Sequence, residues 1–203
     1  ARMYNAILYI SPKGEILGTH RKINITVHEL FYHTRGDGGN NLQVFETELG
    51  KISGLICGEH CQPTLMQYLI IQGSQVNCSL WPGTLPMKTI APTTTQAFCI
   101  AGQHFAVMAC CYIPEDQRPK DFYENNNFNQ IIGGSCIINP RGEIVAGPIY
   151  DKEAIVYYDI DLGQIPLAKS IVNLTGIYSR WDILSLNVRQ KQYEPILPLE
   201  ITQ

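Results

Sequence analysis

Residues 51–60 read KISGLICGEH, and this stretch decides the fold. Its apolar part, Lys51–Cys57, predicts a strand that lies in the interior of a sheet. Pro63 then opens a helical pattern over Thr64–Gln72, with Gly73 as the expected C-terminal cap. A strand, a turn and a helix in this order are the repeating unit of α/β proteins.

The flanking sequence continues this alternation of strands and helices. The turn Ser11-Pro12-Lys13-Gly14-Glu15 predicts a hairpin, and Asn139-Pro140-Arg141-Gly142-Glu143 echoes it. Phe105–Ile113 is apolar throughout and predicts a strand buried on both faces, whereas Pro114–Gln130 predicts a surface loop or lid. The other expected strands are Ala6–Ile10, Ile16–His20, Leu42–Phe45, Val76–Leu80, Ser135–Ile138, Ile144–Gly147 and Ala154–Asp159, and the other helices are Thr93–Gln103 and Gln164–Asn173. We expect one α/β domain over residues 1–203, with an extended tail over about 174–203.

The composition excludes several classes of protein. Charged residues make up 16% of the 203 residues and the formal net charge is −3, so we expect neither a disordered chain nor a nucleic-acid partner. The apolar stretches are far shorter than the roughly 20 residues of a membrane span, so no membrane partner is expected. The seven cysteines are odd in number and lack CxxC pairs, which favours reduced thiols in a cytoplasmic protein. Five of them lie in apolar surroundings and are expected to be buried: Cys78, Cys99, Cys110, Cys111 and Cys136.

Cys57 differs from these because it ends a strand just before a turn and a helix. Backbone N–H groups at such a turn are expected to lower the pKa of the thiol and make it nucleophilic. The alternative is another cysteine of the core.

Lys22 follows a strand and is either a charge-stabilising group or a solvated strand end. For Glu29 the sequence leaves the same two alternatives open, a role in the site or a solvated surface position.

Metal and phosphate sites are poorly supported. Zinc bound by Cys57, His60, Cys61 and Cys78 would lack the paired spacing of structural sites. The glycines of residues 35–39 do not stand between a strand and a helix, as a phosphate-binding loop requires. We therefore expect no metal and no cofactor.

Taken together, these motifs resemble the nitrilase branch of the nitrilase (carbon–nitrogen hydrolase) superfamily. Their order and spacing agree over roughly 180 residues, which is far more specific than any one motif. The matching segments are Tyr4-Asn5, His20-Arg21-Lys22, His28-Glu29, Gly36-Asp37-Gly38, Gly54 to His60 with Pro63, Trp81-Pro82, and Gly176 to Arg180 with Asp182 and Leu184-Ser185.

The resemblance implies a four-layer αββα sandwich, of which this chain is expected to be the C-terminal two-thirds. It also implies a catalytic set in which Cys57 is the nucleophile, Lys22 the lysine and Glu29 the second glutamate. The general-base glutamate of the family is expected about one motif upstream of Tyr4, outside this chain.

The residue after the nucleophile departs from the commonest motif of the family, which has Trp there. Gly58 implies a roomier or differently shaped pocket, and we expect it to contact substrate together with His60 and Trp81. For His60 and Trp81, a plain packing role is the alternative.

The implied reaction is hydrolysis of a small-molecule nitrile to a carboxylic acid and ammonia, through a thioimidate and a thioester on Cys57. An amidase or a cyanide-converting hydrolase on the same residues is a near alternative. A non-catalytic assembly fragment is an alternative of another class, because the general base is expected outside the chain. The resemblance further implies a homo-oligomer that is built from dimers and can extend to a spiral filament.

Overall fold

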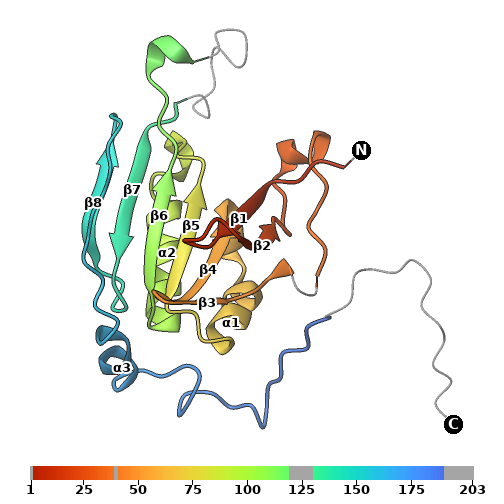
Figure 1. The fold of residues 1–203 in the computed structure, drawn as a ribbon, viewed down its shortest axis with the longest axis vertical. Helices are drawn as coiled ribbons and strands as arrows, with labels where there is room; N and C mark the ends of the chain where they lie inside the picture. Colours follow the sequence, from red (N-terminus) through yellow and green to blue (C-terminus); the bar gives the residue numbers. More distant parts are fainter. Residues whose placement is uncertain (1, 39–40, 119–129, 190–203) are drawn as a thin grey trace, which may run out of the picture.

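The computed structural model describes residues 2–38, 41–118 and 130–189, and its centre is a six-stranded sheet (Figure 1). The sheet order is β3-β4-β5-β6-β7-β8, in which β4, β5 and β6 are parallel and the other pairings are antiparallel. The strands are β3 (Phe45–Thr47), β4 (Gly50–Ile56), β5 (Val76–Trp81), β6 (Phe105–Cys110), β7 (Gly133–Ile138) and β8 (Ile144–Tyr150). The three parallel strands therefore end at the same edge, where catalytic groups of α/β proteins gather.

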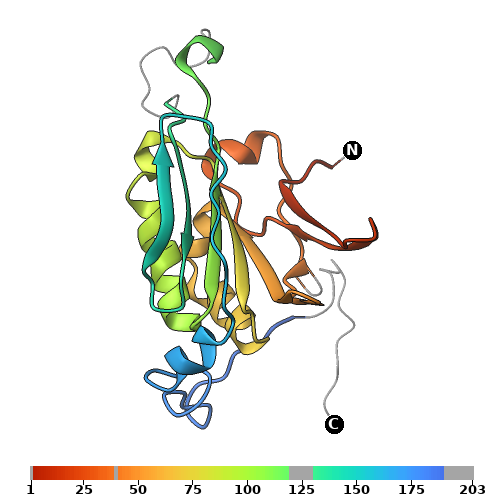
Figure 2. The same ribbon diagram turned by 60° about the vertical axis from the view of Figure 1, so that its left-hand side comes forward.

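Two crossover helices cover one face of this sheet (Figures 1 and 2). They are α1 (Pro63–Ile71), between β4 and β5, and α2 (Ile90–Gly102), between β5 and β6. Leu55 on β4 and Met108 on β6 are buried between the sheet and these helices. Phe98 of α2 is buried in the same layer. A short helix, α3 (Gln164–Lys169), lies at the end of the molecule where β7 and β8 are joined.

A separate hairpin lies against the opposite face of the sheet (Figure 2). It consists of β1 (Ala6–Ile10) and β2 (Ile16–Arg21), paired antiparallel, and Ile7 and Tyr9 of β1 pack against Ile56 of β4. A Cβ atom on Gly54 would lie only 2.5 Å from the Tyr9 hydroxyl, so this glycine is needed for close approach of the hairpin. The described residues thus stack as helices, sheet and hairpin.

Most of the predicted elements are confirmed, with differences at their ends. The helix predicted from Thr93 begins at Ile90 instead, because Pro92 falls in the first turn, where backbone N–H groups need no helical partner. The helix predicted over Gln164–Asn173 ends at Lys169. Residues 119–129 of the predicted loop and residues 190–203 of the predicted tail lie outside the described residues.

Several predictions of strands and burial are wrong. The strand predicted over Leu42–Phe45 begins only at Phe45, and Cys78 and Cys110 are half-buried rather than buried. The strand predicted over Phe105–Ile113 ends at Cys110, and one of its faces is open, since Val107 is 36% exposed. Ala154–Asp159 forms no strand, because it pairs with no strand of the described part of the chain. Cys111, which directly follows β6, is exposed rather than buried. Each error concerns the neighbours that a segment meets in the folded chain. The residues of the segment itself do not specify these neighbours.

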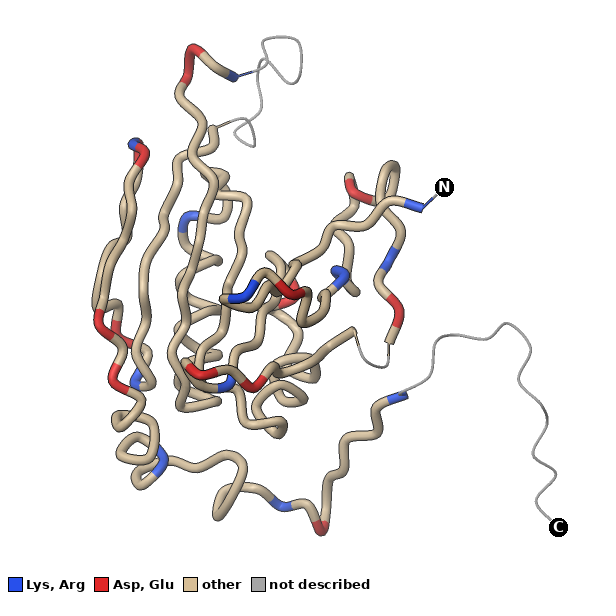
Figure 3. Tube along the Cα trace, in the orientation of Figure 1, with Lys and Arg blue, Asp and Glu red and all other residues tan. Residues whose placement is uncertain are grey.

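The strands β5 to β8 contain no charged residue. Figure 3 shows that Lys, Arg, Asp and Glu lie mainly on the turns and connections around them. None of the helices in the described ranges is long and apolar enough to cross a membrane.

Candidate active site

The candidate nucleophile stands where β4 ends. Cys57 has a backbone φ of +52°, a left-handed conformation that is unfavourable for a side chain with a Cβ atom. It begins a 3-10 turn, Cys57–Cys61, that leads into α1. The side chain of His60 stabilises this turn from the protein interior, since its Nδ1 lies 3.0 Å from the carbonyl oxygen of Cys57. Strained backbone of this kind is concentrated at functional sites, because packing must maintain it.

Lys22 and Glu29 form an ion pair next to this turn. Lys22 is only 2% exposed, which rules out the solvated strand end considered as an alternative. Its Nζ contacts Oε2 of Glu29 and lies 3.2 Å from the hydroxyl of Thr26. A buried ammonium needs such partners, because burial without them is costly.

Glu29 is held from several directions. Its Oε1 accepts a hydrogen bond from the Asn5 side chain at 2.7 Å, and its Oε2 accepts one from the Thr26 backbone N–H at 2.7 Å. Burial raises the pKa of this carboxyl, but the hydrogen bonds from Lys22, Thr26 and Asn5 outweigh burial and lower the pKa to about 2. Glu29 is therefore ionised at neutral pH and orients the side chain of Lys22.

The thiol of Cys57 has a raised pKa, and the prediction of a lowered one is wrong. Burial is the largest cause and raises the pKa, while Lys22 and the backbone N–H of Gly58 act in the opposite direction. Glu29 and Cys61 add smaller upward contributions. Donors around the turn thus favour the thiolate, as expected, but they do not outweigh desolvation. The thiol form of Cys57 is therefore favoured more than in a free cysteine.

The structure places His60 and Trp81 beneath the turn. His60 is 1% exposed, and its ring lies 5.1 Å from the ring of Trp81. The indole N–H of Trp81 donates to the hydroxyl of Thr95 on α2 at 3.3 Å. This geometry favours the packing role for both residues. Gly58, by contrast, has open space beside it, since a Cβ atom added to it would meet no described residue within 4 Å.

Two residues of this region were not assigned a role from the sequence. Asn5 orients Glu29, and Glu59 is a carboxylate that is fully buried directly behind the nucleophile. For Glu59, the available signal in the sequence was an acidic residue within a largely apolar motif. Buried carboxylates are rare unless they are paired, so such a residue indicates a buried pair.

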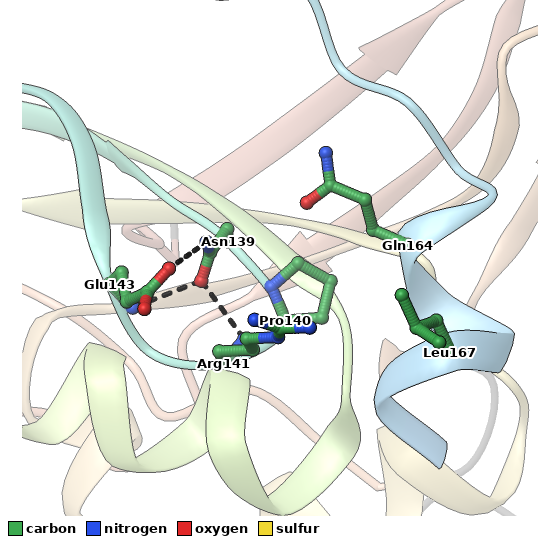
Figure 4. Close-up of a pocket in the computed structure, with 6 residues that line it drawn as sticks. All are labelled: Asn139, Pro140, Arg141, Glu143, Gln164 and Leu167. Atoms are coloured by element: carbon green, nitrogen blue, oxygen red, sulfur yellow. Dashed lines mark hydrogen bonds between the residues drawn. The ribbon is translucent and has the colours of Figure 1, made fainter. Parts of the chain in front are cut away.

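The cavity shown in Figure 4 lies elsewhere. It has a volume of about 240 Å³ and is lined by Asn139, Pro140, Arg141, Glu143, Gln164 and Leu167. Because β7 runs antiparallel to β6, the turn that follows β7 lies at the edge of the sheet opposite to Cys57. We therefore assign no catalytic role to this cavity. Within the described ranges, no group of three or more His, Cys, Asp or Glu is arranged to hold a metal ion.

The arrangement at Cys57, Lys22 and Glu29 agrees with the similarity of the whole sequence to known proteins. The carbon-nitrogen hydrolase family model matches residues 1–169. The chain belongs to the carbon–nitrogen hydrolase family. Within this family it is 32% identical to Nitrilase 1 of Arabidopsis thaliana over 93% of the chain, and 33% identical to a nitrilase of Bacillus sp. over 96% of the chain. These matches confirm the resemblance to nitrilases.

Solved structures of carbon–nitrogen hydrolases show the same fold. A carbon–nitrogen hydrolase from Helicobacter pylori matches with a TM-score of 0.70 and 19% identity, over 83% of this chain and 60% of that protein. A nitrilase-superfamily protein of Saccharomyces cerevisiae matches with a TM-score of 0.71 and 21% identity, over 87% of this chain and 60% of that protein. The predicted fold class is thereby confirmed. The chain spans 56% of the length of the Arabidopsis nitrilase and 60% of the Bacillus nitrilase.

Proposed function

We propose that this chain carries the nucleophile, the lysine and the second glutamate of a nitrilase. The observation that carries the proposal is the buried ion pair of Lys22 and Glu29 beside the strained turn of Cys57. The similarity to curated nitrilases supports a nitrile as the substrate. The overall reaction consumes one nitrile and two waters and yields one carboxylic acid and one ammonia.

In the first half of the reaction, the sulfur of Cys57 attacks the nitrile carbon. Negative charge develops on the nitrile nitrogen, where the ammonium of Lys22 and the N–H of Gly58 stabilise it. Protonation of that nitrogen gives a neutral thioimidate on Cys57. Thiolate is a suitable attacking group because the nitrile carbon is a poor electrophile.

In the second half, two waters complete the hydrolysis. The first adds to the thioimidate carbon, and the resulting tetrahedral intermediate expels ammonia and leaves a thioester. The second attacks the thioester, which releases the carboxylic acid and restores the thiol of Cys57. Each water must lose a proton to a base as it attacks.

Neither carboxylate described near Cys57 is suited to be that base. Glu29 is bound to Lys22, Asn5 and Thr26, and its pKa of about 2 makes it a weak proton acceptor. The pKa of Glu59 is also lowered; burial raises it, but His20 together with the backbone N–H groups of Ile56 and Ile23 outweighs burial. We therefore assign the base to the glutamate that the family resemblance places upstream of Tyr4, and the enzyme to be tested is the full-length protein.

The decisive experiment compares two cysteines of the same turn in the full-length enzyme. Cys57→Ala is expected to abolish ammonia release from nitriles while its far-ultraviolet circular dichroism stays unchanged. Cys61→Ser, which alters the exposed thiol four residues later, is expected to keep the activity. Undiminished ammonia release from Cys57→Ala would disprove the assignment.

Substrate class is tested by parallel assays of aliphatic nitriles, aromatic nitriles, cyanide and amides. We expect the highest kcat/KM with an organic nitrile. Preference for an amide or for cyanide would move the activity to the amidase or cyanide-converting alternative, on the same residues. No turnover of any of them by the full-length protein would favour the non-catalytic alternative.

A further inference from the structure

Glu59 is a buried carboxylate that is surrounded by hydrogen-bond donors. It lies two residues after Cys57 and is 0% exposed. Its Oε2 accepts from the backbone N–H of Ile56 at 2.8 Å and from Nε2 of His20 at 2.7 Å. Its Oε1 accepts from the backbone N–H of Ile23 at 2.7 Å. Both oxygens are thus engaged by groups whose positions matter for the site.

The donors flank the two reactive residues. Ile56 directly precedes Cys57, and Ile23 directly follows Lys22. His20 lies two residues before Lys22, on the same strand end. A single carboxylate therefore binds the chain on both sides of Lys22 and next to Cys57. Along the sequence, Ile23 and His20 lie 36 and 39 residues from Glu59.

His20 is the side-chain partner of Glu59. Its Nδ1 lies 3.0 Å from the carbonyl oxygen of Asn41, and its Nε2 faces the Glu59 carboxylate. Both ring nitrogens of His20 thus face oxygen atoms that accept hydrogen bonds, which fixes the orientation of the ring between Asn41 and Glu59. Asn41 also clamps the intervening residue, because its side chain accepts from the Arg21 N–H at 2.6 Å and donates to the Arg21 carbonyl oxygen at 2.7 Å.

The distance between Lys22 and Cys57 is what this arrangement fixes. Lys22 has a long and flexible side chain, and it stabilises charge on a substrate atom only when its ammonium lies in the right place. Misplacement of a catalytic group by about 1 Å can cost on the order of a hundredfold in rate. The pairing with Glu29 orients the ammonium. The backbone of Lys22 itself hydrogen-bonds to the backbone of Asn5 and Gly36, and the residues on either side of it are held by Glu59 and Asn41.

We propose that Glu59 is a positioning residue that sets the placement of Lys22 relative to Cys57, with His20 as its side-chain partner. The catalytic consequence rests on the proposed function. The positioning does not, because the reactivity of Cys57 toward an alkylating agent reports it without any nitrile.

The test uses Glu59→Gln in the full-length enzyme, in a Cys61→Ser, Cys111→Ser background, so that alkylation reports Cys57 and not the two exposed thiols. Gln has the same shape, but it is neutral and turns an amide group toward at least one of the three donors. We expect kcat for a nitrile to fall by about tenfold or more while KM changes by less than about twofold. We also expect the midpoint of the pH profile of iodoacetamide alkylation to rise, because Lys22 lowers the pKa of the Cys57 thiol.

Asn139→Ala is the matched control. Asn139 is buried and, like Glu59, makes three hydrogen bonds, in the turn at the opposite edge of the sheet (Figure 4). We expect it to lower the melting temperature and to leave kcat and the alkylation midpoint unchanged. If Glu59→Gln behaves in the same way, Glu59 is merely structural and the inference is overturned.

His20→Gln keeps the inference testable if Glu59→Gln does not fold. This variant leaves the two backbone hydrogen bonds of Glu59 in place, so a smaller change in the same directions is expected. A folded His20→Gln enzyme with unchanged kcat and unchanged alkylation midpoint overturns the inference. If the parent enzyme hydrolyses no nitrile, the proposed function is wrong, whereas the alkylation midpoint still decides the positioning.

Discussion

The nucleophile turn has an open side and a buried side, and the two differ in what they contribute. On the open side lie Glu29, which is half-buried, and Gly58, whose added Cβ atom would meet no described residue within 4 Å; the side chain of Lys22, which reaches Glu29, is itself buried. On the buried side lie Glu59 and His60, both almost completely inaccessible to solvent. Both sides contain a carboxylate with a lowered pKa. Only the open side can meet a substrate.

The two sides are expected to have different roles: residues of the open side take part in the reaction, and residues of the buried side position them. Glu29 neutralises a charged group that faces the reaction, while Glu59 binds the backbone from which the reactive groups extend. Substitutions on the open side should therefore change activity more than stability. Substitutions on the buried side should change stability as well.

The largest effect is expected from Glu29→Gln. The neutral amide cannot hold the buried ammonium of Lys22 in its charged and oriented state, so kcat should fall by about a hundredfold. Glu46→Gln is the matched control, because Glu46 pairs with Lys51 at 3.0 Å on the exposed surface, where the same chemical change should leave activity intact. Steady-state assays of both variants check this. Equal activities would show that the ion pair of the open side has no catalytic role.

The next effect is a loss of folding stability in mild acid. We expect it to arise from two buried histidines, His60 on the buried side of the turn and His104 directly before β6. Burial lowers the pKa of His60 from 6.5 to about 4 and that of His104 to about 3. A histidine that is neutral in the folded state stabilises it above pH 6.5, and this contribution is lost as the pH falls toward the folded-state pKa. Between pH 6.5 and 4.5, urea denaturation should show a loss of up to about 1.4 kcal/mol per pH unit for each of the two.

The controls for this prediction are variants of Glu29, beside the turn, and of His104, directly before β6. Glu29→Gln should retain the wild-type slope over this range, because Glu29, with a pKa of about 2, stays ionised throughout. His104→Gln should reduce the slope. A wild-type free energy of unfolding that does not change with pH in this range would contradict the assignment of neutral buried histidines.

The smallest effects come from adding one methyl group near the turn. Gly54→Ala should lower the free energy of unfolding by about 1–3 kcal/mol, because its Cβ would lie 2.5 Å from the Tyr9 hydroxyl and 2.8 Å from Cδ1 of Ile7. Gly58→Ala should change it by less than about 0.5 kcal/mol, because nothing lies within 4 Å of the added atom. Denaturation midpoints of the two variants provide the test. Equal destabilisation would mean that the space beyond Gly58 is occupied.

The hairpin turns were predictable from the sequence because they depend on neighbouring residues. In one turn, the Ser11 hydroxyl accepts hydrogen bonds from the N–H groups of Lys13 and Glu15, and Gly14 adopts a φ of +81°. In the other, the side chain of Asn139 does the same, and Gly142 has a φ of +78°. The surroundings were not predictable: a Cβ on Gly14 meets nothing, whereas one on Gly142 would lie 2.6 Å from Ile100.

The candidate site was predicted in part for the same reason. The placement of Cys57 at a strand end and the candidacy of Lys22 and Glu29 follow from short motifs. The role of Glu59 could not be predicted, because its partners His20 and Ile23 lie more than thirty residues away and meet it only in the folded chain. The direction of the Cys57 pKa shift was missed because burial, the largest cause, is a property of packing.

The sequence by itself determined the order of strands and helices, the two hairpin turns, the family, and the residue types that could do chemistry. Hydrogen bonding within a few residues and hydrophobic periodicity specify all of these locally. Only the tertiary structure decided that Lys22 is buried, that Gly54 must lack a side chain, and that burial raises the pKa of Cys57. The physical reason is that desolvation and close contact depend on segments that are distant in sequence, and packing alone brings them together.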